Sequence, residues 1–332
     1  MAKEKYKSTG GAILNGIKDL FKKRVNIGKL TDNDRLDGKT CLVTGANSGL
    51  GFAIATQLAQ RGAHVIMACR SGIPEAGEKV KALSGSDKVE MMKVDLLDFD
   101  TIYALCDELK ARQVQLDIVI SNAAMVPNKS RKTKYGLEEM FQVNYLAGFV
   151  LINRLLQDGT IPNKTYAQNA QVHTPRIIIV SSEAHRVNRA IDFEHFGDFQ
   201  EYSMGKIVSY YGYYKLILNA FVTELTKRLN PNGELDVSVH ALCPGAVNTN
   251  IAREAPALMK PLVKVMFALF FRSPKKAAEP ALYFACSPDM EGKTGLYLHL
   301  MTQKDMDEKA LESEAGKKVW EKSEELLERI LS

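Results

Sequence analysis

The sequence predicts an α/β fold in which a doubly wound parallel sheet carries helices on both faces, within a single domain. Two observations predict this fold. From residue 39 onward, short apolar runs alternate with segments of helical periodicity, and near-continuous apolar strands of this kind are typical of parallel sheets covered on both sides. A glycine-rich turn also follows the first apolar run and opens a helical segment, which is the arrangement of a Rossmann-like fold.

The strands and helices can be placed in chain order. The runs expected to form strands are 40–44, 64–69, 91–94, 118–120, 177–180, 237–242 and 295–298. The first helix between them has Phe52, Ile54 and Leu58 at helical spacing. The charged, periodic stretch 305–331 predicts one or two surface helices. Because no internal repeat or low-complexity linker interrupts the chain, we expect one Rossmann-fold domain over residues 36–332, after an N-terminal extension over residues 1–35.

Composition narrows the class of protein. The chain has 332 residues, of which 45% are hydrophobic and 25% charged, as is ordinary for a soluble globular protein. The net charge is +5, without the dense basic stripe of a nucleic-acid binder, so we expect no nucleic-acid partner. The five cysteines are odd in number and fit no zinc or disulfide spacing. We therefore expect no metal and a reducing, intracellular compartment.

The N-terminal extension contains a candidate amphipathic helix over residues 11–25. Apolar side chains fall on one face of it and basic side chains follow on the other: Ile13, Leu14, Ile17, Leu20 and Phe21 against Lys18, Lys22, Lys23 and Arg24. A basic amphipathic helix can lie in a membrane interface. The alternatives are an extra helix packed on the domain or a frayed extension. The expected location is therefore cytoplasmic or peripherally membrane-associated.

The turn after the first strand has the pattern of a dinucleotide site. Residues 44–51 read Thr-Gly-Ala-Asn-Ser-Gly-Leu-Gly, between a strand and a helix as such a turn requires. Glycines let the backbone approach a pyrophosphate, and the helix N-terminus offers free N–H groups to its phosphates. At the end of the second strand, Arg70 stands where an acidic residue would bind the ribose 2′-hydroxyl of NAD. An arginine there can pair with the 2′-phosphate, which favours NADP(H).

A tyrosine and a lysine supply a candidate proton donor. Tyr211 and Lys215 are four residues apart, on one face of a helix. An ammonium group near a phenol is expected to lower the phenol pKa, which makes tyrosine usable as a general acid or base. Spacing alone leaves the assignment open, because Tyr210, Tyr213 and Tyr214 lie on the same helix.

Taken together, these motifs resemble the short-chain dehydrogenase/reductase family from about residue 36 to residue 298. The matching segments are 44–51 (TGxxxGxG), Asp95, 121–124 (NNAG), 141–144, 180–182, 211–215 (YxxxK) and 244–249 (PGxVxT). The resemblance implies that Tyr211 transfers the proton, Ser182 holds the substrate oxygen, Lys215 binds the nicotinamide ribose and Asn144 anchors a proton-relaying water. It implies cofactor contacts from Gly45, Asn47, Ser48, Gly49, Leu50, Gly51, Arg70, Asp95, Leu96, Asn122, Tyr211, Lys215, Pro244, Gly245, Val247 and Thr249.

The sequence departs from the family pattern in two places. Ser121 and Ala124 replace an asparagine and a glycine of NNAG, although alanine is small enough for the loop to keep its course. The stretch between Ser182 and Tyr211 is longer than in compact members and is expected to shape the substrate mouth. Its two histidines, His185 and His195, are expected at the surface rather than on the substrate.

Within the family, the chain resembles the retinol dehydrogenase-like group, on segments 64–70, 136–138, 181–185 and 318–326. That resemblance implies a hydrophobic alcohol or carbonyl substrate: a retinoid, a steroid or a lipid aldehyde or ketone. The apolar segment 258–271 fits a lid over such a substrate, a bilayer-docking patch, core or the surface of a homo-oligomer. Two other functions stay open: a non-catalytic nucleotide-sensing or scaffold protein, and a carbonyl reductase for small polar substrates.

Overall fold

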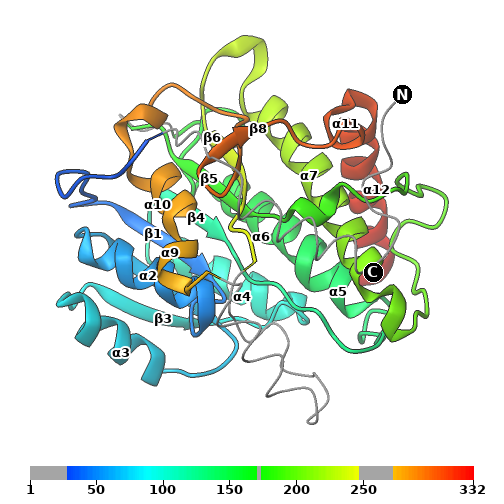
Figure 1. Cartoon of the computed structure of the whole chain (residues 1–332), viewed down its shortest axis with the longest axis horizontal. Coiled ribbons are helices and arrows are strands. Elements are labelled where there is room, and N and C mark those ends of the chain that lie inside the picture. Colours follow the sequence, from blue (N-terminus) through cyan, green and yellow to red (C-terminus); the bar gives the residue numbers. More distant parts are fainter. Residues whose placement is uncertain (1–27, 170–172, 247–271) are drawn as a thin grey trace.

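The apolar runs form the strands of one sheet in the computed structural model, which describes residues 28–169, 173–246 and 272–332 (Figure 1). The strands are β1 (Thr40–Thr44), β2 (His64–Cys69), β3 (Val89–Lys93), β4 (Ile118–Ser121), β5 (Arg176–Val180), β6 (Ser238–Cys243), β7 (Tyr297–His299) and β8 (Thr302–Lys304). The expected strands are all present, and β3 begins two residues earlier than expected. The sequence did not predict β8, because this short edge strand is polar and has no apolar run.

The order of the strands is β3-β2-β1-β4-β5-β6-β7-β8. Neighbouring strands are parallel from β3 to β7, and β8 pairs antiparallel with β7. The chain therefore adds β2 and β3 on one side of β1, and then crosses to the other side of β1, where it adds β4 and the later strands. In open α/β sheets, ligands bind beyond the carboxyl ends of the strands at such a switch point.

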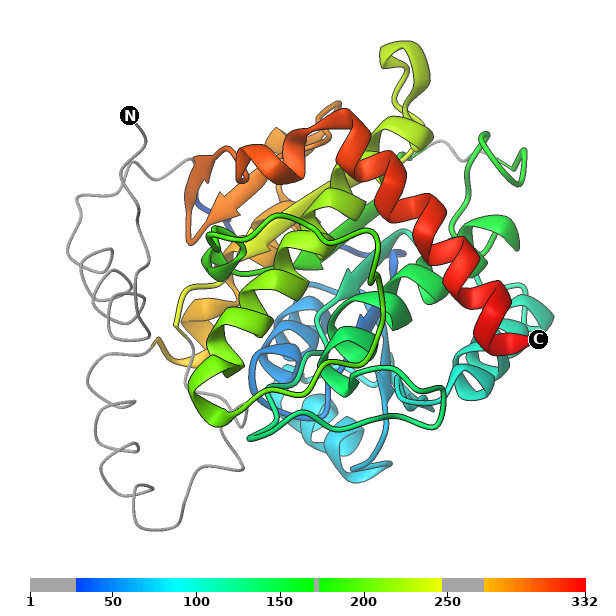
Figure 2. The same cartoon turned by 90° about the vertical axis from the view of Figure 1, so that its right-hand side faces the viewer.

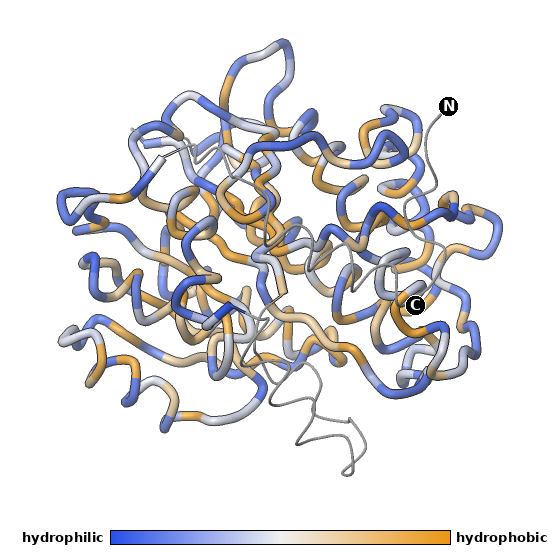
Figure 3. The backbone as a smooth tube through the Cα atoms, viewed as in Figure 1, coloured by the Kyte–Doolittle hydropathy of each residue, from blue (hydrophilic) through white to orange (hydrophobic). Residues whose placement is uncertain are grey.

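Helices cover both faces of the sheet. They include α2 (Gly49–Gln60), α3 (Glu75–Ser84), α9 (Pro274–Ala277) and α10 (Glu279–Cys286) on one face, and α4 (Phe99–Ala111), α6 (Ala147–Gln157) and α7 (Ile207–Leu229) on the other. Successive residues of a strand point to opposite faces, so Leu42 joins one apolar core while Cys41 and Val43 join the other. This explains why the strands are apolar throughout. The interior of the tube drawing is correspondingly hydrophobic (Figure 3).

The C-terminal stretch forms two helices, as expected: α11 (Glu308–Leu311) and α12 (Ser313–Leu331). α12 lies along the outside of α7 (Figure 2). Its Trp320 ring packs 5.1 Å from the ring of Phe149 on α6 and 5.9 Å from that of Phe221 on α7, between centroids. The Ser323 hydroxyl is 2.5 Å from the buried hydroxyl of Tyr145. α12 is thus part of the core on this side of the sheet.

The cysteines, one asparagine and the lengths of the helices bear on the cellular compartment and on membrane contact. All five cysteines are buried free thiols. Asn163, the acceptor of one glycosylation sequon, is buried and donates its amide to the carbonyls of Leu156 and Ile161. Among the described residues, no helix is long and apolar enough to span a membrane. The helix expected at residues 11–25 lies outside the described residues, so membrane contact through it stays a prediction.

Candidate active site

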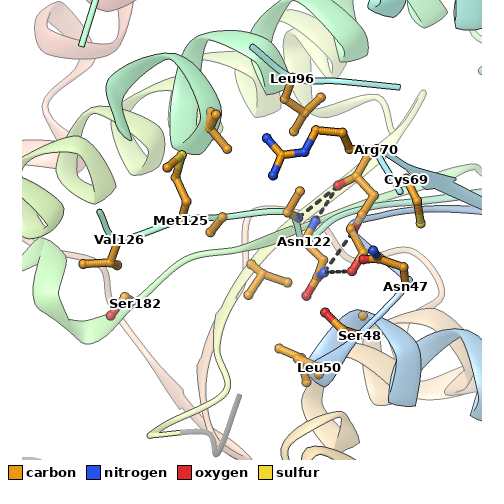
Figure 4. Close-up of a pocket in the computed structure, with 18 of the residues that line it drawn as sticks. Asn47, Ser48, Leu50, Cys69, Arg70, Leu96, Asn122, Met125, Val126 and Ser182 are labelled. Atoms are coloured by element: carbon orange, nitrogen blue, oxygen red, sulfur yellow. Dashed lines mark hydrogen bonds between the residues drawn. The ribbon is translucent and has the colours of Figure 1, made fainter. Parts of the chain in front are cut away.

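A cavity of about 610 Å³ opens beyond the carboxyl ends of β1, β4, β5 and β6 (Figure 4). It collects most of the site residues expected from the sequence. These are Gly45, Asn47, Ser48, Gly49, Leu50, Gly51, Arg70, Asp95, Leu96, Asn122, Ser182, Tyr211, Lys215, Pro244 and Gly245. Arg70 and Ser182 lie toward opposite ends of it. Val247, Thr249 and the apolar segment 258–271 lie outside the described residues.

The glycine turn has the geometry of a pyrophosphate cradle. Gly45 and Gly49 have φ of +65° and +58°, a left-handed conformation that glycine adopts without strain. A Cβ on Gly51 would overlap the carbonyl oxygen of Gly45. The first turn of α2 has no acidic residue and no capping side chain, so its N–H groups are available to an anion. The turn therefore fits the diphosphate of a dinucleotide cofactor.

The ends of β1 and β4 are joined by side-chain hydrogen bonds. The hydroxyl of Thr44 accepts from the backbone N–H groups of Asn122 and Ala123, at 3.0 and 3.1 Å. The Asn122 amide donates to the carbonyl of Thr44 at 2.8 Å. The loop after β4 thus keeps its place beside the glycine turn even with Ser121 and Ala124 in the NNAG motif.

Arg70 and Asp95 define the end of the cavity that is distant from Ser182. The Arg70 guanidinium lies 3.9 Å from the Asp95 carboxylate and is 61% exposed, so it can turn toward an anion. The Asp95 carboxylate accepts from the backbone N–H of Leu97 at 3.0 Å. Asn47 donates to the carbonyl of Ser71 at 2.9 Å and so ties the loop after β2 to the glycine turn. No carboxylate follows β2 directly.

Ser182, Tyr211 and Lys215 meet at the other end of the cavity. Tyr211 and Lys215 are one turn apart on α7, with the Lys215 ammonium 5.9 Å from the Tyr211 ring centroid. Lys215 Nζ donates to the carbonyl of Val180 at 2.8 Å. The Ser182 side chain lies close enough to Tyr211 to lower the Tyr211 pKa, and its oxygen accepts from the backbone N–H of Ala184 at 3.2 Å. The hydroxyl proton of Ser182 is therefore directed away from its own turn.

Burial sets the pKa values of the two ionisable groups. It raises the pKa of Tyr211 to about 12, against a smaller lowering by the Ser182 hydrogen bond. It lowers the pKa of Lys215 to about 8. We expected the ammonium to lower the Tyr211 pKa, and this expectation was wrong for the protein alone, because burial disfavours the phenolate and Lys215 has already lost its proton at the pH where Tyr211 ionises. Lys215 instead titrates close to neutral pH.

Asn144 is placed differently from the rest of the expected catalytic set. It lies on a π-helical turn, Gln142–Leu146, between α5 (Glu139–Phe141) and α6, and such turns occur frequently at functional sites. Its buried side chain accepts from the backbone N–H of Met125 at 2.8 Å and donates to the Met125 carbonyl at 2.9 Å. The side chain thus holds the loop after β4, and a proton relay anchored at Asn144 stays a prediction.

Sequence reasoning missed three features of the site. Gly212 packs so closely on the 3-10 turn Glu183–His185 that a Cβ there would overlap the carbonyl oxygen of Ala184. Arg131 and Glu139 form an ion pair of 2.6 Å on the cavity wall. His185 is buried, which corrects the expectation that it lies at the surface, whereas His195 is exposed as expected. The close contact at Gly212 did have a signal in the sequence, namely a glycine directly after the candidate proton donor Tyr211.

The comparisons with known proteins agree with this geometry. A model of the short chain dehydrogenase family matches residues 39–191. Retinol dehydrogenase 14 of Mus musculus is 34% identical, over 88% of this chain and 87% of that protein. Polyprenol dehydrogenase of Homo sapiens is 30% identical, over 79% and 76%. The solved structure of an uncharacterized protein from Mycobacterium Paratuberculosis aligns with a TM-score of 0.67 and 27% identity, over 91% and 98%.

The chain belongs to the short-chain dehydrogenase/reductase family, whose members are oxidoreductases that use NAD(P)(H). Within this family it falls in the retinol dehydrogenase-like group. The fold and the family support action on a CH–OH group.

Replacing Gly212 by alanine should separate α7 from the turn that carries Ser182. The new methyl group would overlap the Ala184 carbonyl, so helix or turn must shift. We expect a loss of about 1–3 kcal/mol in the free energy of unfolding, measured in urea, and a fall of about tenfold or more in turnover. Gly205→Ala is the matched control, since a Cβ there meets nothing within 4 Å. Equal effects of the two substitutions would contradict the role given to Gly212.

The stability of the protein should depend on pH through Lys215. Its pKa of about 8 lies below the ordinary 10.5, so between these pH values the unfolded chain binds more protons at this site than the folded chain. The free energy of unfolding therefore rises with pH across this window; as the pH drops, it falls until about pH 8 and then levels off, because both states carry the proton there. Compared with Lys215→Met by urea denaturation without cofactor, the wild-type protein should gain about 3 kcal/mol across the window. A difference that does not change with pH would contradict this.

Proposed function

We propose that the protein is an NADP(H)-dependent oxidoreductase that transfers a hydride between the nicotinamide and a hydrophobic alcohol or carbonyl, with Tyr211 as general acid and base. The observation that carries the proposal is the convergence of Ser182, Tyr211 and Lys215 in the cavity that also contains the glycine turn. A proton donor and a phosphate cradle in one cavity are what nicotinamide-dependent carbonyl reduction requires.

Each side chain has a task in this reaction. When bound, the nicotinamide cofactor supplies or accepts the hydride. The Ser182 oxygen is held as an acceptor by the Ala184 N–H, so its proton can donate to the substrate oxygen and place it beside the Tyr211 hydroxyl. With its pKa raised to about 12, Tyr211 is protonated at neutral pH and ready to donate during reduction. Proton transfer of this kind contributes about 10²–10⁴-fold to rate.

Lys215 then stabilises the product of that proton transfer. Once Tyr211 becomes a phenolate, a negative charge lies within reach of the buried Lys215 amine, and this charge favours the ammonium form. The lowered pKa of Lys215, about 8, lets its charge respond to the state of Tyr211 near neutral pH. The pair can therefore take up and release a proton together in either direction of the reaction.

Arg70 supports NADP(H) over NAD(H). Its guanidinium lies near Asp95 at the adenosine end of the cavity and is exposed enough to reach a phosphate. A charge-assisted hydrogen bond to a phosphate is among the stronger polar interactions. The absence of a carboxylate directly after β2 removes the partner that would bind a free ribose 2′-hydroxyl.

The cavity and the relatives support a hydrophobic substrate. The loop after β4 contributes Met125, Val126 and Pro127 to the wall, and Cys243 lies at the end of β6. The names of two relatives, retinol dehydrogenase and polyprenol dehydrogenase, both refer to isoprenoid alcohols. A retinoid, steroid or other lipid alcohol or carbonyl fits these observations. The Arg131–Glu139 ion pair on the same wall is the feature that would favour a small polar carbonyl compound instead.

Tyr211→Phe should abolish turnover, because it removes the hydroxyl that transfers the proton. We expect NADPH oxidation with the best of a panel of retinoid, steroid, aliphatic and small polar carbonyl compounds to fall by at least about 10²-fold. Tyr210→Phe is the control, because its hydroxyl is bonded to Gln200, 2.9 Å away, and not to Ser182. Tight NADPH binding by the wild-type protein without turnover in either direction would support a sensing or scaffold role instead.

Arg70→Ser should change the choice of cofactor. Loss of a charged hydrogen bond to the 2′-phosphate, worth about 1.5–3 kcal/mol, should raise the KM for NADPH by about 10–150-fold. The KM for NADH, which lacks that phosphate, should change little. A parallel increase for both cofactors would mean that Arg70 does not distinguish them.

A further inference from the structure

His185 connects the Ser182 turn, which consists of Ser182 and the 3-10 residues Glu183–His185, to the C-terminal part of the chain. Its buried ring lies with Nδ1 at 2.6 Å from the carbonyl oxygen of Ser182 and Nε2 at 3.0 Å from the backbone nitrogen of Asp307. A backbone N–H can only donate, so Nε2 accepts and the ring is neutral, with its proton on Nδ1. Nδ1–H therefore donates to the Ser182 carbonyl. Both ring nitrogens are fixed by their partners.

The hydrogen bond to Ser182 acts on the backbone that orients the Ser182 hydroxyl. The Ser182 carbonyl accepts twice from His185, from its ring and from its backbone N–H at 3.1 Å. These bonds close the 3-10 turn Glu183–His185, in which the Ala184 N–H donates to the Ser182 oxygen. The same turn contacts Gly212, next to Tyr211. A rotation of this turn would therefore move Ser182 relative to Tyr211.

The C-terminal segment holds the same turn at other points. Tyr297 on β7 donates its hydroxyl to Glu183 at 3.0 Å, and Lys304 on β8 lies 3.3 Å from the same carboxylate. Arg186 donates to the carbonyl of Asp305. The Tyr297 ring also packs edge-on against His185, with 5.3 Å between the ring centroids. The turn is thus supported by residues that follow it by more than a hundred positions.

We propose that His185 is a positioning residue for the reaction, whose Nδ1–H holds the Ser182 turn against the C-terminal segment and so keeps the Ser182 hydroxyl on Tyr211. In its kinetic part the proposal rests on the function proposed above. His185 does not touch the substrate, since it is fully buried and does not line the cavity.

Two conservative variants separate the two hydrogen bonds of the ring. The asparagine amide nitrogen occupies nearly the position of Nδ1, so His185→Asn keeps a donor to Ser182 and leaves the Asp307 N–H without its acceptor. The glutamine amide oxygen reaches the position of Nε2, so His185→Gln keeps the bond to Asp307 and lacks the donor to Ser182. The same substitutions at His195, an exposed side chain beside Asp192, are the controls.

The kinetic experiment compares kcat and KM for the best substrate in these variants. We expect His185→Gln to lower kcat by about 10- to 100-fold with KM nearly unchanged, because a misplaced catalytic group slows the chemical step. His185→Asn should keep kcat within about threefold of wild type, despite a lower thermal midpoint. An equal loss of kcat in both variants, or none in either, would overturn the proposal.

A second measurement decides the proposal even if no substrate turns over. The chain is labelled with tyrosine carrying ¹³C at Cζ, and the Tyr211 signal is assigned by its absence in Tyr211→Phe. Because the Ser182 hydroxyl interacts with the Tyr211 hydroxyl, the Tyr211 signal at neutral pH should shift in His185→Gln and stay at the wild-type position in His185→Asn. An unchanged Tyr211 signal in His185→Gln would reduce His185 to a purely structural role. Loss of wild-type turnover alone would count against the proposed function and not against this proposal.

Discussion

The hydrogen bonds between the ends of β1 and β4 are the constraint on which the site depends. The two strands are neighbours at the point where the sheet changes direction, so their following loops separate and leave a crevice. Thr44 and Asn122 hold these loops at a fixed spacing, with the glycine turn on one side and the loop after β4 on the other. Asn144, on the π-helical turn before α6, then holds the second loop through Met125. These bonds join the end of β1, the loop after β4 and the turn that carries Asn144.

The site also contains polar side chains whose burial lowers the stability of the fold. Lys215 is 1% exposed, and no carboxylate of the described residues pairs with it. Nearby in the chain, the Ser181 hydroxyl and the side chain of Asn219, one turn beyond Lys215, are buried polar groups without a hydrogen-bond partner among the described residues. Such groups reduce stability, and a sequence selected for stability alone would replace them. Two of the residues with such groups, Ser181 and Asn219, therefore adjoin the candidate catalytic residues Ser182 and Lys215.

The sequence predicted much of the fold, and most of the site residues expected from it lie in the cavity, for a physical reason. Buried parallel strands must be apolar on both faces, and a phosphate cradle needs glycine at few positions, so both leave a pattern. β8 left none, because a polar edge strand resembles a loop. The burial of His185 could not be predicted, because it depends on contact with Asp307, far along the chain. The raised pKa of Tyr211 was missed because spacing gives the proximity of a lysine but not the depth of burial.

The Ser182 turn is held by Tyr297, Asp305 and Asp307, which are synthesised long after the turn itself. Residues 40–121 span β1 to β4 and include the whole glycine turn, and they leave the ribosome early. The residues that hold Ser182 in place are synthesised almost two hundred positions after β4. We therefore expect a nascent chain to acquire the shape of its cofactor site well before its catalytic geometry. A chain that stops before Tyr297 would contain the whole glycine turn but none of these supports of the Ser182 turn.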